Sequence, residues 1–215
     1  TLPDAKAALK SLTVPQDRYS YIDDAQTFNA FFDEGTTLGF GLGYLVRADA
    51  VWLRLVQPRS PAAAAGMRRG DRIVSIDGTA VQALIAEDRL DAAFGPIEAG
   101  YSASFVIERA GQLQTLRVVK QTYPIDSVLA ARMLPGGQRP TGYINLYTFN
   151  NPARVAWFTA LARLIAEGAQ DLVVDLRENS GGLLTLANEI ASSLAPVDSP
   201  GKLFIRSEYN LGHAD

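Results

Sequence analysis

Residues 60–78, SPAAAAGMRRGDRIVSIDG, carry the signals for a short helix followed directly by a strand. Ser60 is a favoured N-cap residue, and Pro61 suits the first helical position because its missing N–H would have no partner there. Gly66 follows the alanine run and predicts the end of the helix. The next residues, GDRIVSIDG, predict a strand closed by an Asp-Gly turn. The segment therefore favours a small β-rich domain.

The rest of residues 35–122 fits the same β-rich domain. Two predicted strands, GFGLGYLV and AVWLRLV, come first, and ASFVIER and LQTLRVV predict a hairpin at the end. Between them, Gln82 to Phe94 predicts a single helix with core positions at Leu84, Leu90 and Phe94.

The flanking segments differ in character. Residues 1–34 predict two helical pieces separated at Pro15, the second ended by Gly35. Residues 123–141 are rich in proline and glycine and predict a connector. Residues 142–215 alternate strand and helix in GYINLYTF, PARVAWFTALARLIAEG, DLVVDL, LLTLANEIASSLA and KLFIR. This βαβαβ order implies parallel strands with right-handed crossovers. The predicted fold class is a multidomain α+β and α/β chain with an N-terminal helical segment.

Composition excludes several classes of site. The 215 residues include no cysteine and one histidine, His213, so we expect no disulfide, no metal and no cofactor. The net charge of −3 argues against nucleic acid as a partner, because phosphate binding depends on clustered lysine and arginine. No apolar run approaches the ~18 residues of a transmembrane helix. The chain begins at Thr1 without a charged-then-apolar leader, so we expect that a secretory signal was never present or was removed.

The glycines of GFGLG at 39–43 allow two interpretations. The spacing does not fit a dinucleotide-binding loop, and a strand follows where a helix should open. Consecutive N–H groups of such a loop can converge on a carboxylate, and the following strand can add an extended peptide to its edge. The alternative is a glycine-rich turn without a ligand.

Residues 60–78 resemble the most recognisable segment of PDZ domains, S-P-A-x-x-A-G-Φ-x-x-G-D-x-I-x-x-I-D-G. This resemblance implies a β-barrel-like domain with two helices over residues 35–122. It also implies that Phe40, Gly41 and Leu42 supply N–H groups to the terminal carboxylate of a peptide. The helix 82–94 would then flank the peptide groove.

The loop DLRENSGG at 175–182 follows an apolar strand, where ligands bind in open α/β sheets. A helix from about Leu183 would direct its free N–H groups at the loop, which favours an oxyanion or other anion site. The alternative is an ordinary βα loop that needs glycine for steric reasons.

Ser180 lacks the surroundings of a nucleophile. Its position i−2 is Glu178, so it does not fit G-x-S-x-G, and His213 lies in a polar tail. Ser199 and Lys202 spell S-x-x-K, but the Pro-Gly between them predicts a turn instead of the helix that would bring the two side chains together.

The order of motifs resembles the C-terminal processing (tail-specific) serine proteases. The carrying segments are DRYSY at 17–21, the PDZ-like domain, the GYI strand and DLRENSGG, so the resemblance covers residues 17–206. It implies an oxyanion-hole N–H from Gly181, with Gly182 second, and a catalytic serine and lysine later in the chain. Ser180 would then cap the following helix.

Several expectations follow from this resemblance. The chain would hold an amino-terminal region, a PDZ domain and the first part of a protease domain, residues 142–215, and would be inactive alone. Its partners would be the C-terminal peptide tails of protein substrates. It would be located in the envelope of a bacterium. Its truncated sheet could drive self-association. The rival is a non-catalytic PDZ adaptor on a degenerate protease-like domain.

Overall fold

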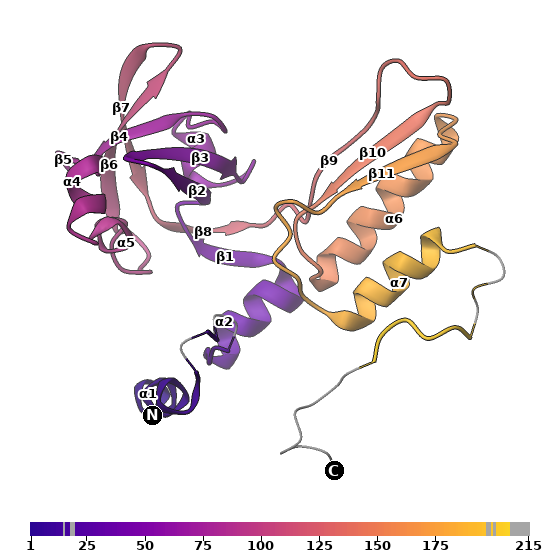
Figure 1. Ribbon diagram of the computed structural model, residues 1–215, viewed down its shortest axis with the longest axis horizontal. Helices are drawn as coiled ribbons and strands as arrows, with labels where there is room; N and C mark the ends of the chain where they lie inside the picture. Colours follow the sequence, from indigo (N-terminus) through magenta and orange to yellow (C-terminus); the bar gives the residue numbers. More distant parts are fainter. Residues whose placement is uncertain (15, 18–19, 197–198, 200, 207–215) are drawn as a thin grey trace.

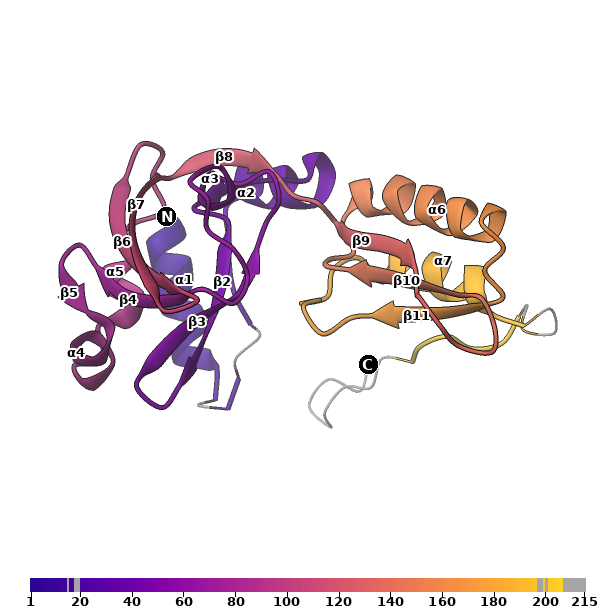
Figure 2. The same cartoon turned by 90° about the horizontal axis from the view of Figure 1, so that it is seen from above.

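The computed structural model describes residues 1–14, 16–17, 20–196, 199 and 201–206. Arg18 and Tyr19 of the DRYSY motif and His213 lie outside the described residues. The chain forms two lobes, a β-rich lobe and an α/β lobe, which are joined by the paired strands β1 (Thr36–Gly39) and β8 (Gln121–Pro124) (Figures 1 and 2).

The β-rich lobe is an antiparallel sheet with strand order β2-β3-β4-β6-β7, to which β5 adds beside β4. Its core includes the fully buried side chains of Val51, Ile73 and Phe105. Strand β2 has a neighbour on one side only, so it forms an edge of the sheet. The elements of this lobe are β2 (Leu42–Arg47), β3 (Ala50–Val56), α3 (Pro61–Ala64), β4 (Arg72–Ile76), β5 (Thr79–Ala80), α4 (Val81–Ala86), α5 (Leu90–Ala93), β6 (Ser102–Arg109) and β7 (Gln112–Val119).

Residues 60–78 form the predicted helix, strand and turn. The Ser60 hydroxyl accepts a hydrogen bond from the N–H of Ala63 at 3.2 Å and caps α3. The β4–β5 turn has positive φ at Asp77 and Gly78, 45° and 81°, as a tight Asp-Gly hairpin turn requires.

The predicted helix from Gln82 to Phe94 is wrong in one respect, because it breaks into α4 and α5. Asp88 lies between them with a φ of +53°, a left-handed conformation that aspartate tolerates better than most residues. The break turns Leu90 back into the core beside Leu84, and both side chains are buried as predicted.

The α/β lobe has a three-stranded sheet with order β11-β10-β9. Strands β10 and β11 are parallel, and α6 and α7 contact each other through a hydrogen bond from Trp157 Nε1 to Ser193 Oγ at 3.2 Å. One core of buried residues joins both helices to the sheet, and Trp157 is its largest fully buried side chain. The elements are β9 (Val128–Met133), β10 (Thr141–Leu146), α6 (Asn151–Ala166), β11 (Asp171–Asp175) and α7 (Leu184–Leu194).

Two predictions for this region need correction. Residues 123–141 are not a connector, because β9 pairs antiparallel with β10 and the loop between these two strands holds Pro135, Gly136, Gly137 and Pro140. Residues 202–206 form no strand in the part of the chain that the structure describes, and the side chains of Leu203, Phe204 and Ile205 are exposed. A strand needs a hydrogen-bonded neighbour, so apolar β-forming residues alone do not make one.

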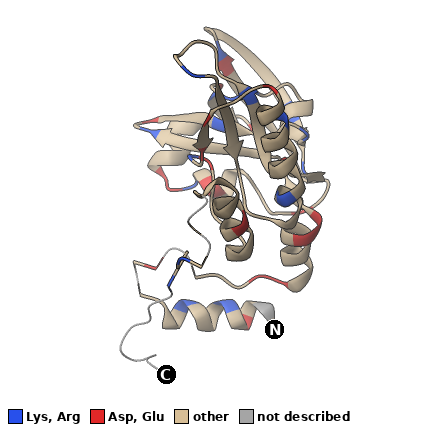
Figure 3. Ribbon diagram, turned by 90° about the vertical axis from the view of Figure 1, so that its right-hand side faces the viewer, with Lys and Arg blue, Asp and Glu red and all other residues tan. Residues whose placement is uncertain are grey.

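The N-terminal segment is helical as predicted, with α1 (Leu2–Leu12), α2 (Ala25–Asn29) and the π-helix η1 (Ala30–Glu34). Gly35 ends η1 with a φ of +67°. Figure 3 shows α1 as a separate helix at the edge of the molecule, with both basic and acidic positions coloured along its ribbon. Among the described residues, no helix is both long and apolar enough to span a membrane.

Candidate functional site

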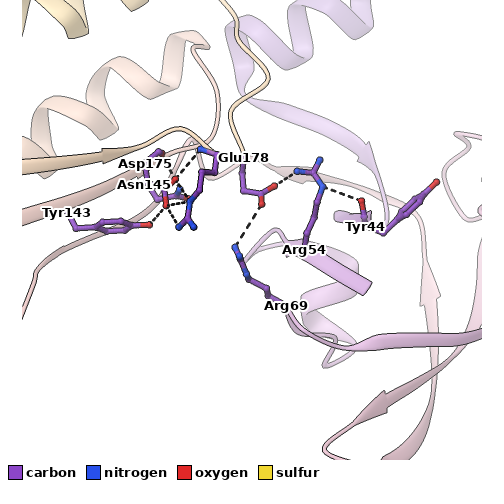
Figure 4. A network of polar contacts seen from close by, with 8 residues as sticks. Tyr44, Arg54, Arg69, Tyr143, Asn145, Asp175 and Glu178 are labelled. Carbon is purple, nitrogen blue, oxygen red and sulfur yellow. Dashed lines mark hydrogen bonds and ion pairs between the residues drawn. The ribbon is translucent and has the colours of Figure 1, made fainter. Parts of the chain in front are cut away.

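The glycine loop, residues 176–183, begins at a firmly held carboxylate at the end of β11. Asp175 accepts hydrogen bonds from Arg177 Nη2 and Tyr143 Oη, both at 2.6 Å (Figure 4). These hydrogen bonds, above all those from Arg177, hold the pKa of Asp175 well below its usual range. A carboxylate that stays ionised in this way anchors the loop and is poorly suited to general acid or base work.

Within the glycine loop, Gly181 is fully engaged in hydrogen bonds. Its N–H donates to Asn179 Oδ1 at 2.7 Å, and its carbonyl accepts from Phe149 N–H at 3.0 Å and Thr148 Oγ1 at 3.2 Å. Asn179 in turn donates to the Leu146 carbonyl at 3.1 Å. The loop is therefore tied to the end of β10 and to the segment that follows it.

Gly182 differs from its neighbour. Its φ is +138°, and an added Cβ would overlap the carbonyl oxygen of Phe149, so only glycine fits here. That carbonyl accepts a hydrogen bond from Leu183 N–H at 2.8 Å, and the Gly182 N–H has no acceptor among the residues that the structure describes. The resemblance ranks Gly181 before Gly182 as the oxyanion donor, whereas within the described residues the N–H of Gly181 is bonded to Asn179 and that of Gly182 has no acceptor.

Ser180 is exposed, and the prediction that it caps the following helix is wrong. The N-cap of α7 is Leu183, without a side-chain hydrogen bond, because the Gly-Gly turn separates Ser180 from the helix start. Within the described part of the chain, no hydrogen bond joins Ser180 to a base. Lys202 N–H donates to the Ser199 carbonyl at 3.0 Å, which is consistent with the predicted turn.

The predicted carboxylate loop connects β1 to β2. The Phe40 carbonyl accepts from Ala62 N–H at 2.9 Å, and the Gly41 carbonyl accepts from Gln57 N–H at 2.8 Å. Gly41 has a φ of +82°, and a Cβ there would overlap Ser60. The N–H groups of Phe40 and Gly41 have no acceptor among the described residues, and Leu42 begins edge strand β2.

Lys120 lies beside this loop and was missed by the sequence analysis. Its side chain helps to line a cavity of about 300 Å³ together with Phe40, Gly41 and Leu42. Its ammonium donates to the carbonyls of Gly95 at 3.0 Å and Pro96 at 2.6 Å, and lies 4.8 Å from the centre of the Phe40 ring. No carboxylate bonds to it in the described part of the chain.

Burial affects the pKa of Lys120. The residue is only 4% exposed, and this burial lowers the pKa of its ammonium. Two of the three ammonium protons have hydrogen-bond acceptors, and the ammonium also lies over the rings of Phe40 and Tyr101. The signal in the sequence was one lysine after the alternating strand LQTLRVV, in a chain with only four lysines.

The cavity beside the carboxylate loop has a second wall, formed by contacts between β2 and α5. The Tyr44 ring stacks on Phe94 at 4.8 Å, and its hydroxyl donates to Asp91. Burial, with the Asp91 hydrogen bond, raises the pKa of Tyr44 to about 12, so the hydroxyl remains a donor at neutral pH. Asp91 and Phe94 line this cavity, and both belong to the segment 82–94 that the PDZ resemblance places beside the peptide groove.

The two lobes also meet at the glycine loop. Glu178 pairs with Arg54 of β3 and lies 4.0 Å from Arg69, both from the β-rich lobe (Figure 4). Arg59 pairs with Asp126 at 2.6 Å nearby. These contacts could not be predicted from sequence spacing, because the partners are far apart along the chain.

Two protein-family models match parts of this chain. Residues 140–210 match the model of peptidase family S41, and residues 52–92 match a PDZ domain model. The chloroplastic C-terminal processing peptidase of Tetradesmus obliquus is 36% identical over 149 residues, which are 64% of this chain and 32% of that protein. A carboxy-terminal processing protease of Bacillus subtilis is 31% identical over 195 residues, 88% of this chain and 40% of that protein.

A solved structure of an S41 protease from Bacteroides fragilis has the same fold. It superposes with a TM-score of 0.57 at 21% identity, over 90% of this chain and 52% of that one. The chain spans 32% and 40% of the length of the two curated relatives described above. Its matches to the S41 and PDZ models and to these two processing proteases place it in the C-terminal processing protease family, with an internal PDZ domain.

Proposed function

We propose that this chain supplies substrate recognition and an oxyanion donor to a serine endopeptidase whose Ser-Lys dyad lies outside these residues. The observation that supports this most is the Gly182 N–H, which has no acceptor within the described residues and lies beyond the carboxyl end of β11. In this mechanism a desolvated, neutral lysine takes the serine proton, and the N–H stabilises the oxyanion that forms. One such donor is worth about 10²–10³ in kcat.

The β-rich lobe would bind the C-terminal tail of a protein substrate. The terminal carboxylate would accept hydrogen bonds from the N–H groups of Phe40, Gly41 and Leu42 and face the ammonium of Lys120. The preceding residues would add to the free edge of β2 as an extra strand. We expect dissociation constants at about the micromolar level or weaker, which corresponds to a binding free energy of about −8 kcal/mol or less favourable.

The described chain should not hydrolyse unstructured proteins, because it holds no nucleophile paired with a base. Incubation with casein, followed on gels and by mass spectrometry, checks this. Turnover that disappears in the Ser180→Ala variant would show that Ser180 is a nucleophile after all. Labelling of the longer protein by a fluorophosphonate decides between enzyme and adaptor, since a non-catalytic PDZ adaptor has no activated serine to react.

The α/β lobe should self-associate or be less stable than the β-rich lobe. Val173 of β11 and Val155 of α6 are exposed, and β11 has an unpaired edge among the described strands. Hydrogen exchange should show faster exchange in residues 142–206 than in 39–120, or protection that rises with concentration. Equal protection in a strictly monomeric chain would mean that the lobe is complete as it stands.

We also propose an exported, envelope location in a bacterium. The support is the likeness to a bacterial and a chloroplastic processing protease. Fractionation of cells that express the tagged protein tests it.

A further inference from the structure

A cavity of about 880 Å³, here called the aromatic chamber, lies beside the glycine loop. One wall comes from α2 and η1 and contains Phe28, Phe31 and Phe32. A second wall comes from strand β1 with Thr122 of its partner β8, and the glycine loop contributes Gly181 and Gly182. Neither recognition of the terminal carboxylate nor stabilisation of the oxyanion explains the aromatic wall.

The aromatic wall is ordered but only partly covered. The Phe28 and Phe31 rings lie 4.5 and 5.0 Å from the ring of Phe32, and Phe28 is 44% exposed. Two asparagine side chains hold the wall in place. Asn150 Nδ2 donates to the Phe31 carbonyl at 3.2 Å, and Asn151 Nδ2 donates to Asp33 at 2.7 Å. An exposed aromatic surface that is held in place is a feature of binding sites.

The same short segment also holds the glycine loop. Thr148 and Phe149 bind the Gly181 carbonyl, directly before Asn150 and Asn151. The aromatic wall and the Gly182 N–H are therefore attached to four consecutive residues and keep a fixed separation. A group bound at Gly182 has this wall as a neighbour.

The second wall offers main-chain hydrogen bonds. Strand β1 pairs with β8 along one side only, so its other edge is unpaired among the described strands. Thr36, Thr37 and Leu38 of β1 all line the chamber. A free strand edge recruits an extended polypeptide, and alternate side chains of that polypeptide then point to the same side.

We propose that the aromatic chamber binds the substrate polypeptide next to the scissile bond, with the substrate as an added strand on β1 and an apolar side chain against Phe28. This inference rests on the proposed function, since Gly182 must be the oxyanion donor. A carbonyl oxygen held about 3 Å from the Gly182 N–H leaves its own side chain in the adjoining space. That space is the chamber.

The test uses the longer protein with its dyad and two peptides that share one apolar free C-terminus. The peptides differ only in leucine or asparagine before the scissile bond, whose position is first mapped by mass spectrometry. The Phe28→Ala variant should lower kcat/KM for the leucine peptide about tenfold, because a lost apolar contact costs about this much. It should change kcat/KM for the asparagine peptide by less than about twofold. Phe28→Leu should retain most of the preference.

Phe158→Ala is the matched control. Phe158 is 40% exposed on α6 and does not line the chamber, so its loss should leave kcat/KM for both peptides unchanged. If Phe28→Ala slows both peptides equally, Phe28 has a structural role only and the inference is wrong. If the unaltered protein binds the peptides but cleaves neither, the proposed peptidase function fails, and the chamber assignment fails with it.

Discussion

Replacing Gly182 by alanine should lower kcat of the longer protein by about 10²–10³, the loss expected when an oxyanion donor is displaced. The alanine Cβ would overlap the Phe149 carbonyl oxygen, and a φ of +138° is strained for any residue with a side chain. The loop must therefore move, and its N–H moves with it. Peptide cleavage measures the loss, and calorimetry on the same peptide should show unchanged binding to the β-rich lobe.

Gly181→Ala is the matched comparison for this loss. Gly181 also has a positive φ, +105°, but an added Cβ there would meet no atom within 4 Å. Its N–H is already bonded to Asn179, so this variant should lose clearly less activity than Gly182→Ala. A larger loss from Gly181→Ala would return the donor role to Gly181, as the sequence had suggested.

Replacing Lys120 by methionine should weaken binding of a free-acid peptide about 30-fold or more. Removing one member of a buried charge pair typically costs about 2–5 kcal/mol. The amidated form of the same peptide should bind the unaltered protein weakly, and Lys120→Met should change that binding little. Titration calorimetry with both peptides and both proteins gives the coupling between the lysine and the terminal charge.

Two variants control for side effects of this substitution. Lys120→Arg keeps the charge and should keep most of the preference for the acid, whereas Arg89→Gln removes an exposed charge away from the cavity and should have no effect. If Lys120→Met does not fold, the NMR signal of Lys120 Cε in the unaltered protein serves instead. It should shift with the acid peptide and not with the amide. Equal affinity for acid and amide would refute the carboxylate assignment.

Local chemistry made part of the fold predictable from sequence. Ser60 caps its helix and the Asp77-Gly78 turn closes its hairpin because each depends on a few adjacent residues. The position of the glycine loop was predictable for a similar reason, since it directly follows an apolar strand. Strand β9 was missed because its pairing with β10 outweighs the Pro-Gly composition around it.

The parts of the site that escaped prediction depend on distant partners. Glu178 looked like a mismatch to a nucleophile motif, yet it pairs with Arg54, 124 residues earlier. Lys120 is a candidate site residue because the surrounding loops bury its side chain beside the cavity. The choice between Gly181 and Gly182 depended on one side-chain oxygen, that of Asn179, which sequence spacing could not place.

The pairing of β1 with β8 means that the β-rich lobe is inserted into another domain. The chain enters this lobe through Thr36–Gly39 and leaves it through Gln121–Pro124, and the register places Thr36 opposite Pro124. Residues before β1 lie against α6, where Gly35 faces Pro152, so they belong with the α/β lobe that resumes after β8. Entry and exit points that lie side by side let an inserted domain be exchanged or removed with little disturbance to its host. In this architecture, the proposed peptide-binding lobe can change while the frame around the glycine loop stays constant.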